Sequence, residues 1–239
     1  MGSTNLKTIA QHIKTFCRIF SVRANQTAGF SIVSYTGTGT ANDSVGHGLN
    51  AAPEFIITKN RDSSTYSWRV FTTAIDGSLD RLFLDATSSK ADQSTINVPT
   101  SSVFYLGSNL DHNNSGDAII AYCFAPVSQY SAFGVYTGNG SADGTFVYTG
   151  FRPAFVLTKA TGATENWSIF DNKREGYNPD NSRLYPNASD AEATSATVDL
   201  LSNGFKLRRN TALTNGSGNE YLYVAFAENP FQANGGLAR

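Results

Sequence analysis

The side chains of this 239-residue chain that could bind or transform a ligand are histidines, tryptophans and acids. His47 lies between Gly46 and Gly48, and glycines let a ligand approach the backbone closely. Trp68 and Trp167 could stack on the apolar face of a sugar ring, although a tryptophan close to a phenylalanine is more often part of a core. We therefore expect His47 on an exposed turn and both tryptophans in the core, and we keep all three as ligand-binding candidates.

Two groups of oxygen-bearing side chains suggest calcium binding and glycoside hydrolysis. The hard oxygen ligands available for Ca²⁺ are Asp111, Asn113, Asn114 and Asp117. Their spacing differs from that of an EF-hand loop. The acids available for a glycosidase pair, whose carboxyls must lie about 5 to 9.5 Å apart, are Asp62, Asp76, Asp80 and Asp85. Both groups are typical of solvated loops, so we predict no metal site and no catalytic residue.

The remaining reactive residues are too scattered to form a motif. His12, His47 and His112 are far apart, and no CxxC or HxxxH pattern occurs. Cys123 lies in an apolar run, which predicts a buried free thiol; a disulfide with Cys17 is the alternative. We expect a protein that has no cofactor and is not an enzyme.

Charge and hydropathy argue against two classes of partner. The 18 lysines and arginines balance 19 acids, so the net charge of −1 gives no general attraction to nucleic acid. No apolar run approaches the ~18 residues of a membrane-spanning helix, and residues 1–20 lack a signal-peptide pattern. The charged fraction is only 15%, and aromatic, β-branched and turn-forming residues are common, which predicts an all-β protein.

One sequence pattern occurs twice, about 100 residues apart. The motif Tyr-Thr-Gly-x-Gly starts at Tyr35 and again at Tyr136, 101 positions later. The other matched blocks keep their order and nearly the same offset: Ala52–Lys59 with Arg152–Lys159, Trp68–Phe71 with Trp167–Phe170, Phe104–Leu106 with Phe205–Leu207, and Ile120–Ala125 with Leu222–Ala227. This spacing predicts two tandem copies of one domain, with a junction short enough that the copies pack together.

Each copy contains several short strand-like segments separated by turns. Ala118–Phe124 and Tyr221–Phe226 are apolar on both faces, which is typical of central strands. One open sheet could not bury so many faces, so we predict a two-sheet β-sandwich in each copy, jelly-roll or lectin-like. The predicted organisation is an N-terminal arm or amphipathic helix in residues 1–28, β-sandwich repeat 1 in 29–127 and β-sandwich repeat 2 in 128–239.

The helix is predicted from the apolar residues near the N-terminus. Leu6, Ile9, Ile13, Phe16 and Phe20 fall at helical spacing. A short amphipathic helix is marginal alone, so we expect it to pack on the first copy or to dock on another subunit.

The repeated blocks resemble a repeat of uncharacterised proteins from marine tailed bacteriophages. The segments that carry the resemblance are Gly29–Gly37, Val45–Leu49, Lys59–Asp62, Ala121–Phe124, Tyr136–Gly140 and Gly150–Val156. The resemblance extends from about Ser21 to Arg239. It implies a structural protein of the virion, in the tail or fibre or as a capsid decoration, and it assigns no catalytic residue.

Three function classes follow. The leading expectation is a non-enzymatic virion structural protein, made in the host cytoplasm, that assembles as a homo-oligomer and with other virion proteins. The alternative is a carbohydrate-binding adhesin whose polar, low-charge loops recognise host surface glycans. A depolymerase is the least favoured class. We expect no nucleic-acid partner and no membrane span.

Overall fold

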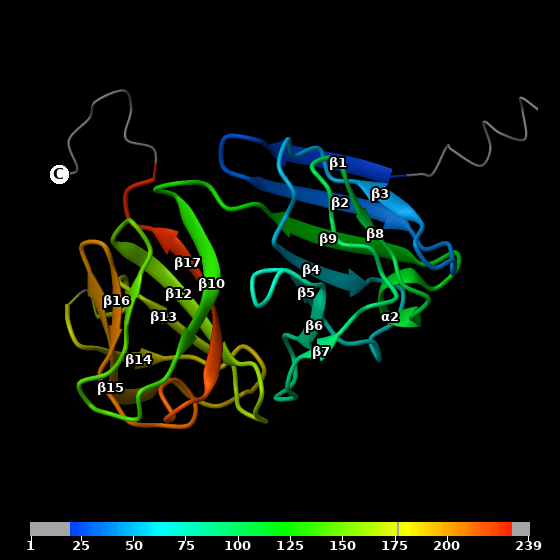
Figure 1. Cartoon of the computed structure of the whole chain (residues 1–239). Helices are drawn as coiled ribbons and strands as arrows, with labels where there is room; N and C mark the ends of the chain where they lie inside the picture. The colour runs from blue at the N-terminus through cyan, green and yellow to red at the C-terminus, as the bar shows by residue number, and fades with distance from the viewer. Residues whose placement is uncertain (1–19, 176, 231–239) are drawn as a thin grey trace, which may run out of the picture.

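The computed structural model describes residues 20–175 and 177–230 of the chain (Figure 1). These residues are 42% strand and 2% helix in several antiparallel sheets, so the all-β prediction is confirmed. Within this part of the chain no helix is long and apolar enough to cross a membrane. Residues 1–19 of the predicted N-terminal arm or helix, Cys17 among them, lie outside the described residues. Phe20–Asn25 form a strand paired in the first sheet, which corrects the prediction for that part of the arm.

The first half of the chain, residues 20–127, forms a seven-stranded sheet and a two-stranded sheet. The large sheet has the order β1-β2-β9-β4-β5-β6-β7, and the small sheet pairs β3 with β8. The strands are β1 (Phe20–Asn25), β2 (Phe30–Thr36), β3 (Ser44–Gly46), β4 (Phe55–Asn60), β5 (Arg69–Thr72), β6 (Asp80–Phe83), β7 (Ala91–Asp92), β8 (Val103–Tyr105) and β9 (Ala118–Phe124). One short helix, α2 (Leu110–Asn113), precedes β9.

The second half, residues 128–230, forms two four-stranded sheets. Their orders are β10-β17-β12-β13 and β11-β16-β15-β14. The strands are β10 (Ser131–Thr137), β11 (Phe146–Tyr148), β12 (Pro153–Ala160), β13 (Ser168–Asp171), β14 (Asp180–Arg183), β15 (Ala193–Leu201), β16 (Gly204–Leu207) and β17 (Glu220–Ala227).

The two halves share a strand order. The series β2-β9-β4-β5 in the first half is matched by β10-β17-β12-β13 in the second, and β3-β8 is matched by β11-β16. β9 and β17, the strands that are apolar on both faces, each lie inside a sheet, as predicted. Among the described strands, none pairs with a strand of the other half.

A buried tyrosine makes the same contact in each half. The hydroxyl of Tyr35 donates to His112 O at 2.7 Å, and the hydroxyl of Tyr136 donates to Thr214 O at 2.8 Å. Each bond ties the end of an early strand to the segment that precedes the last strand of that half, which is α2 in the first half and a loop in the second. The tyrosine of the repeated motif therefore satisfies a backbone carbonyl that would otherwise be buried without a partner.

A buried asparagine completes the repeated motif. Asn113 accepts a hydrogen bond from Thr38 N at 2.7 Å, and Asn215 accepts one from Asn139 N at 3.0 Å. Both asparagines are fully buried. They hold the glycine-containing turns of the two halves, which explains why the motif returns with its glycines in place.

The alternation of side chains along the strands produces three hydrophobic cores. In β9, Ala121 and Cys123 face a core that also takes side chains from the β3-β8 sheet. In β17, Tyr221 faces a second core, between the two sheets of the second half. Its neighbour Leu222 faces a third core, between the halves. Cys123 is buried and free, as predicted.

The third core joins the two halves face to face. Its fully or nearly fully buried side chains are Phe55, Val70, Ile75, Leu82, Leu157, Trp167, Leu222 and Val224. Two hydrogen bonds cross beside it: Trp167 Nε1 donates to Phe83 O at 2.8 Å, and Lys90 N donates to Thr161 O at 2.7 Å. The halves therefore pack against each other, as the short junction predicted.

The two tryptophans lie in different environments. Trp167 is fully buried between the halves, whereas Trp68 is 36% exposed. The prediction that both tryptophans are core is therefore wrong for Trp68. The physical reason is that Trp68 lies just before the start of β5 and outside the three cores, where it stacks on Tyr122 with ring centroids 6.4 Å apart.

Candidate functional site

His47 is fully buried, which corrects the prediction of an exposed turn. Its Nδ1 accepts a hydrogen bond from Leu49 N at 3.1 Å, and its Nε2 lies 3.1 Å from Thr100 O. Because Nδ1 is an acceptor, Nε2 carries the proton and donates to that carbonyl. Burial lowers the pKa of His47 despite the hydrogen bond to Thr100. Both ring nitrogens are thus occupied, and the imidazole serves the fold.

A buried charged network connects β5 to α2. Arg69 Nε donates to Asp111 Oδ2 at 2.7 Å, and His112 Nδ1 donates to Asp111 Oδ1 at 2.9 Å. His112 Nε2 accepts from Gly107 N at 3.0 Å, so the imidazole is neutral with its proton on Nδ1. Arg69 is 5% exposed and His112 is fully buried.

The network shifts the pKa values of its members in a consistent direction. Burial lowers the pKa of His112, and the hydrogen bond to Asp111 does not compensate. Burial acts to raise the pKa of Asp111, but the hydrogen bond from His112 and the charge of Arg69 hold it below its usual value. An Asp–His pair is part of a catalytic triad, yet here Nε2 is already bonded to Gly107 N–H. This pair therefore has no free nitrogen to act as a base.

An open groove with a volume of about 300 Å³ is lined by this network and by the loops beside it. The lining residues are Thr65, Tyr66, Ser67, Arg69, Phe83, Asn109, Leu110 and Asp111. Apolar surface alternates with hydroxyl and amide groups, and the charges of Arg69 and Asp111 cancel. Such a lining suits a polar, uncharged ligand better than an ion.

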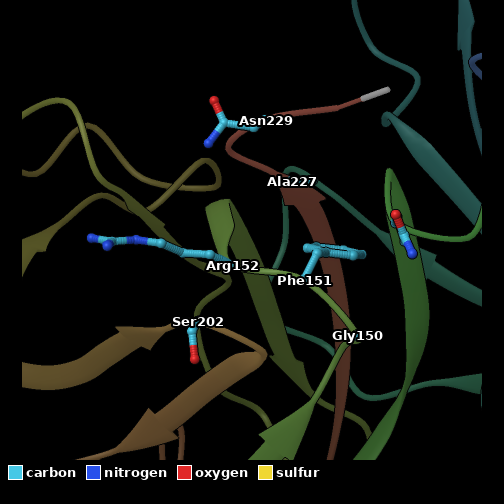
Figure 2. A pocket seen from close by; sticks show the side chains of 7 residues that line it. Gly150, Phe151, Arg152, Ser202, Ala227 and Asn229 are labelled. Atoms are coloured by element: carbon cyan, nitrogen blue, oxygen red, sulfur yellow. The ribbon is translucent and has the colours of Figure 1, made fainter. Parts of the chain in front are cut away.

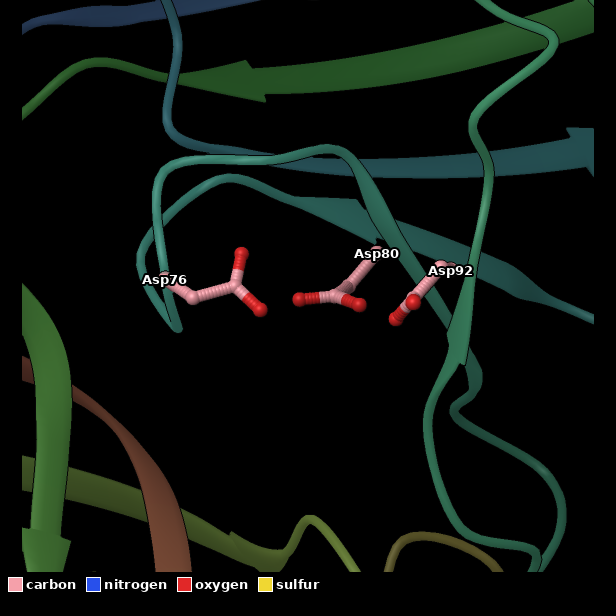
Figure 3. Close-up of side chains that lie close together, drawn as sticks. All are labelled: Asp76, Asp80 and Asp92. Atoms are coloured by element: carbon pink, nitrogen blue, oxygen red, sulfur yellow. The ribbon is translucent and has the colours of Figure 1, made fainter.

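Three aspartates converge near the β7 edge of the large sheet (Figure 3). The carboxylate oxygens of Asp76, Asp80 and Asp92 lie within 4.8 Å of one another, the one such group of potential metal ligands in the described part of the chain. Lys90 Nζ lies 3.1, 2.9 and 3.1 Å from the three carboxylates. An ammonium group thus already supplies a cation at this cluster.

Burial distinguishes one of these aspartates, Asp80, from the solvated loop acids that were predicted. Asp80 is fully buried, which corrects that prediction, whereas the side chain of Asp76 is 49% exposed. Hydrogen bonds from Ser78 and Lys90 lower the pKa of Asp76 to about 2. Burial raises the pKa of Asp80, against the effect of Lys90. Lys90 therefore compensates a buried carboxylate and holds the loop that reaches the second half.

The remaining predicted acids and amides organise loops. Asp62 and Asp85 accept hydrogen bonds from backbone amides at 2.7 and 3.0 Å. Asp117 accepts from Asn60 and Asn114 at 2.7 and 2.8 Å. Asn114 and Asp117 are thus bonded to each other, and Asp76 and Asp80 share Lys90. The side chains considered for calcium binding or glycoside hydrolysis are engaged in contacts within the protein.

A second cavity, of about 180 Å³, lies at the end of the second half (Figure 2). Its lining residues are Gln129, Gly150, Phe151, Arg152, Ser202, Ala227 and Asn229. Arg152 Nε is paired with Glu228 Oε2 at 3.1 Å, which neutralises the one charged side chain of the lining. The cavity is too small for most ligands of drug size, which take about 300 to 1,000 Å³.

Lys159 is another buried charge that sequence reasoning missed. It is fully buried, and Nζ donates to Ala160 O at 2.8 Å and to Ala163 O at 3.1 Å. Burial lowers its pKa to about 8. Its counterpart Lys59 donates to Tyr66 O in the equivalent loop. The repeated Thr-Lys pair was visible in the sequence, but nothing in it indicated that the lysine turns inward to bind carbonyls.

Comparison with known proteins gives a family without an assigned activity. No curated protein and no solved structure matches the chain. A family model described as Domain of unknown function (DUF7483) matches residues 13–230, which include both halves. The chain therefore belongs to the DUF7483 family.

Proposed function

We propose that this chain is a non-enzymatic structural protein of a bacteriophage virion, a tail or fibre component or a capsid decoration, built from two β-sandwich repeats of jelly-roll or lectin-like kind. The resemblance of the repeated blocks to marine phage proteins supports the viral assignment. The observation that carries the structural role is the third core, which fuses the halves into one block.

This block is stiffened by aromatic side chains from both halves. The rings of Phe55 and Phe133 are stacked with centroids 6.2 Å apart, and those of Phe124 and Phe226 are 5.9 Å apart. Aromatic pairs of this kind add stability beyond the area they bury, about 0.5–1.5 kcal/mol each. A block joined in this way resists bending between its repeats, which suits a part that must keep its shape in a particle.

The reactive side chains among the residues that the structure describes support a role without catalysis. His47 and His112 have both ring nitrogens bonded within the protein, and Lys90 is surrounded by carboxylates. Burial raises the pKa of the Cys123 thiol to about 12, so no thiolate forms near neutral pH. These groups stabilise the fold instead of facing a substrate.

Proteomic analysis of purified particles of the encoding phage tests the proposal. We expect the chain in a fixed number of copies per particle, retained through density-gradient purification. Particles from a phage that lacks the gene should miss the corresponding part in electron micrographs. A chain that is abundant in infected cells but absent from purified particles would contradict the proposal.

Trp68 favours a second candidate function, an adhesin that binds host surface saccharides. Its ring is 36% exposed and is backed by Tyr122, an arrangement that can stack on a sugar. A glycan array with the wild type and Trp68→Ala tests this candidate. We expect binding that Trp68→Ala abolishes and that Tyr148→Ala, at a residue 67% exposed in the second half, leaves intact. Absence of wild-type binding across the array would refute it.

A further inference from the structure

The outer edge of β10 differs from that of its counterpart β2. In the first half, Ala125 N donates to Gly29 O at 2.7 Å. Because hydrogen-bonded and non-hydrogen-bonded residue pairs alternate in an antiparallel ladder, this bond determines which residues of β2 direct their backbone groups toward β9. Ile32 and Ser34 then turn their backbone groups to the other side, toward β1. The edge of β2 is therefore closed by a strand of the same chain.

The same alternation leaves β10 open. Ala227 N donates to Tyr130 O at 2.8 Å, so Ala132, Gly134 and Tyr136 use their backbone groups toward β17. Phe133 and Val135 turn their N–H and C=O groups outward. Among the described residues no hydrogen bond uses these four groups, and β10 is an edge strand of its sheet.

β10 also lacks the features that protect free edges. Natural edge strands are shortened, charged, bulged or interrupted by proline, because a bare edge invites another strand. β10 has seven residues, Ser131–Thr137, with no charge and no proline. By contrast, the outer strand β1 carries Arg23 and β14 carries Arg183. The isolated bridge on β10 is at its first residue, Ser131, to Val127, and it leaves Phe133 and Val135 uncovered.

We propose that the outer edge of β10 pairs with β10 of a second copy of this chain, antiparallel and about a two-fold axis. Two identical antiparallel strands offer each other matching donors and acceptors, so one edge is complementary to itself. No charge opposes the contact. The half-buried side chains of Phe133 and Val135 belong to the core between the halves, so pairing extends that core across the two copies.

This inference deepens the proposed structural role and rests on it for its biological meaning. The dimer itself is measured on the purified chain, without any particle. A monomeric chain that is present in virions would overturn the inference and leave the proposed function standing. A dimer that is absent from virions would overturn the proposed function alone.

Light scattering over a range of concentrations, with three variants, tests the pairing. The wild type should reach twice the chain mass of 25.7 kDa. Val135→Pro removes one outward N–H but no bond to β17, so this variant should stay monomeric at every concentration. Val135→Ala keeps the N–H and should dimerise. Ala24→Pro, on the outer side of the edge strand β1 of the first half, should dimerise as well.

Three results would overturn the proposal: a wild-type monomer at millimolar concentration, a dimer unaffected by Val135→Pro, or a dimer abolished by Ala24→Pro. A second measurement covers the case in which Val135→Pro does not fold. At dimer concentrations of the wild type, the amides of Phe133 and Val135 should exchange at least ~10-fold more slowly than in dilute solution. Unchanged exchange would overturn the pairing.

Discussion

The two halves have six matched strands each and the same buried tyrosine and asparagine contacts, but they differ in where charge is buried. Thr58 faces Arg69 across β4 and β5, whereas the matching Thr158 faces Ser168 across β12 and β13. The ion pair of Arg69 with Asp111 has no equivalent at Ser168. The comparison teaches that the matched strands form without this charged network, which is an addition to one half.

The halves also differ in what covers them. β1 pairs with the outer edge of β2, whereas no described strand pairs with the outer edge of the matching strand β10. Trp167 is buried against the first half, and its counterpart Trp68 is open to solvent. Matched positions therefore carry out different tasks: the second half provides the surface that joins the repeats, and the first half provides the exposed ring.

The largest effect is expected from Trp167→Ala. The substitution opens a cavity between the halves and removes the hydrogen bond to Phe83 O, so we expect the free energy of unfolding to fall by about 3–5 kcal/mol. Urea unfolding followed by circular dichroism measures it. Because the core is shared, exchange protection should fall in both halves. A loss confined to the second half would show that the halves do not support each other.

Breaking the charged network of the first half should lower the free energy of unfolding nearly as much as Trp167→Ala does. Asp111→Leu leaves Arg69 charged and buried without its partner, and we expect a loss of about 3 kcal/mol. The double variant Arg69→Ser and Asp111→Leu, which makes the strand position resemble Ser168 of the second half, should recover most of it. Unfolding free energies of the four proteins form a double-mutant cycle. Additive losses would contradict the coupling.

Acid should weaken the first half more than the second. Histidine occurs at positions 12, 47 and 112 only, and burial lowers the pKa of His47 and His112 below the usual 6.5. The unfolded chain therefore takes up protons at a higher pH than the folded chain does. Stability should fall as pH drops below about 6.5, by at most ~1.4 kcal/mol per pH unit for each histidine.

Urea unfolding at pH 7, 6 and 5 measures this dependence. The double variant His47→Gln and His112→Gln should show a flatter profile over the same range. A wild-type profile as flat as that of the double variant would contradict the assignment of the acid sensitivity to these two rings.

Trp68→Ala should have the smallest effect. The ring is partly exposed and contacts Tyr122 at the sheet margin, so we expect a loss below about 1 kcal/mol. The contrast with Trp167→Ala is the sharpest measure of how far the matched positions have diverged. Equal losses in thermal unfolding of the two variants would contradict their different environments.

The repeat and the strands could be predicted from the sequence because alternating side chains and turn residues are local signals. Ala118–Phe124 was predicted as a central strand from its two apolar faces, and β9 has that position. The burial of His47 and Asp80 could not be predicted, because it depends on residues brought together by the sheets. Thr100, which bonds to His47, is distant from it in the sequence. Lys90, which pairs with Asp80, lies in an irregular segment.

The candidate sites were predicted poorly for the same reason. Arg69 stands beside Trp68 in a repeated block, and its replacement by serine in the second copy was the available sign that the two halves differ there. Its partner Asp111 was considered only as a calcium ligand. Pairing across 42 positions of sequence is a property of the packed sheets and leaves no local pattern.

Residue-resolved amide exchange over the whole chain tests the central claim, that one β unit occurs twice and that its first strand is covered by β1 in the first half and open in the second. The slowest amides should lie on matched strands, β9 with β17 and β4 with β12. In dilute solution, Ile32 and Ser34 should be protected by β1, whereas Phe133 and Val135 exchange freely. Protection patterns that do not match between the halves, or equal protection of β2 and β10 in the monomer, would contradict the claim.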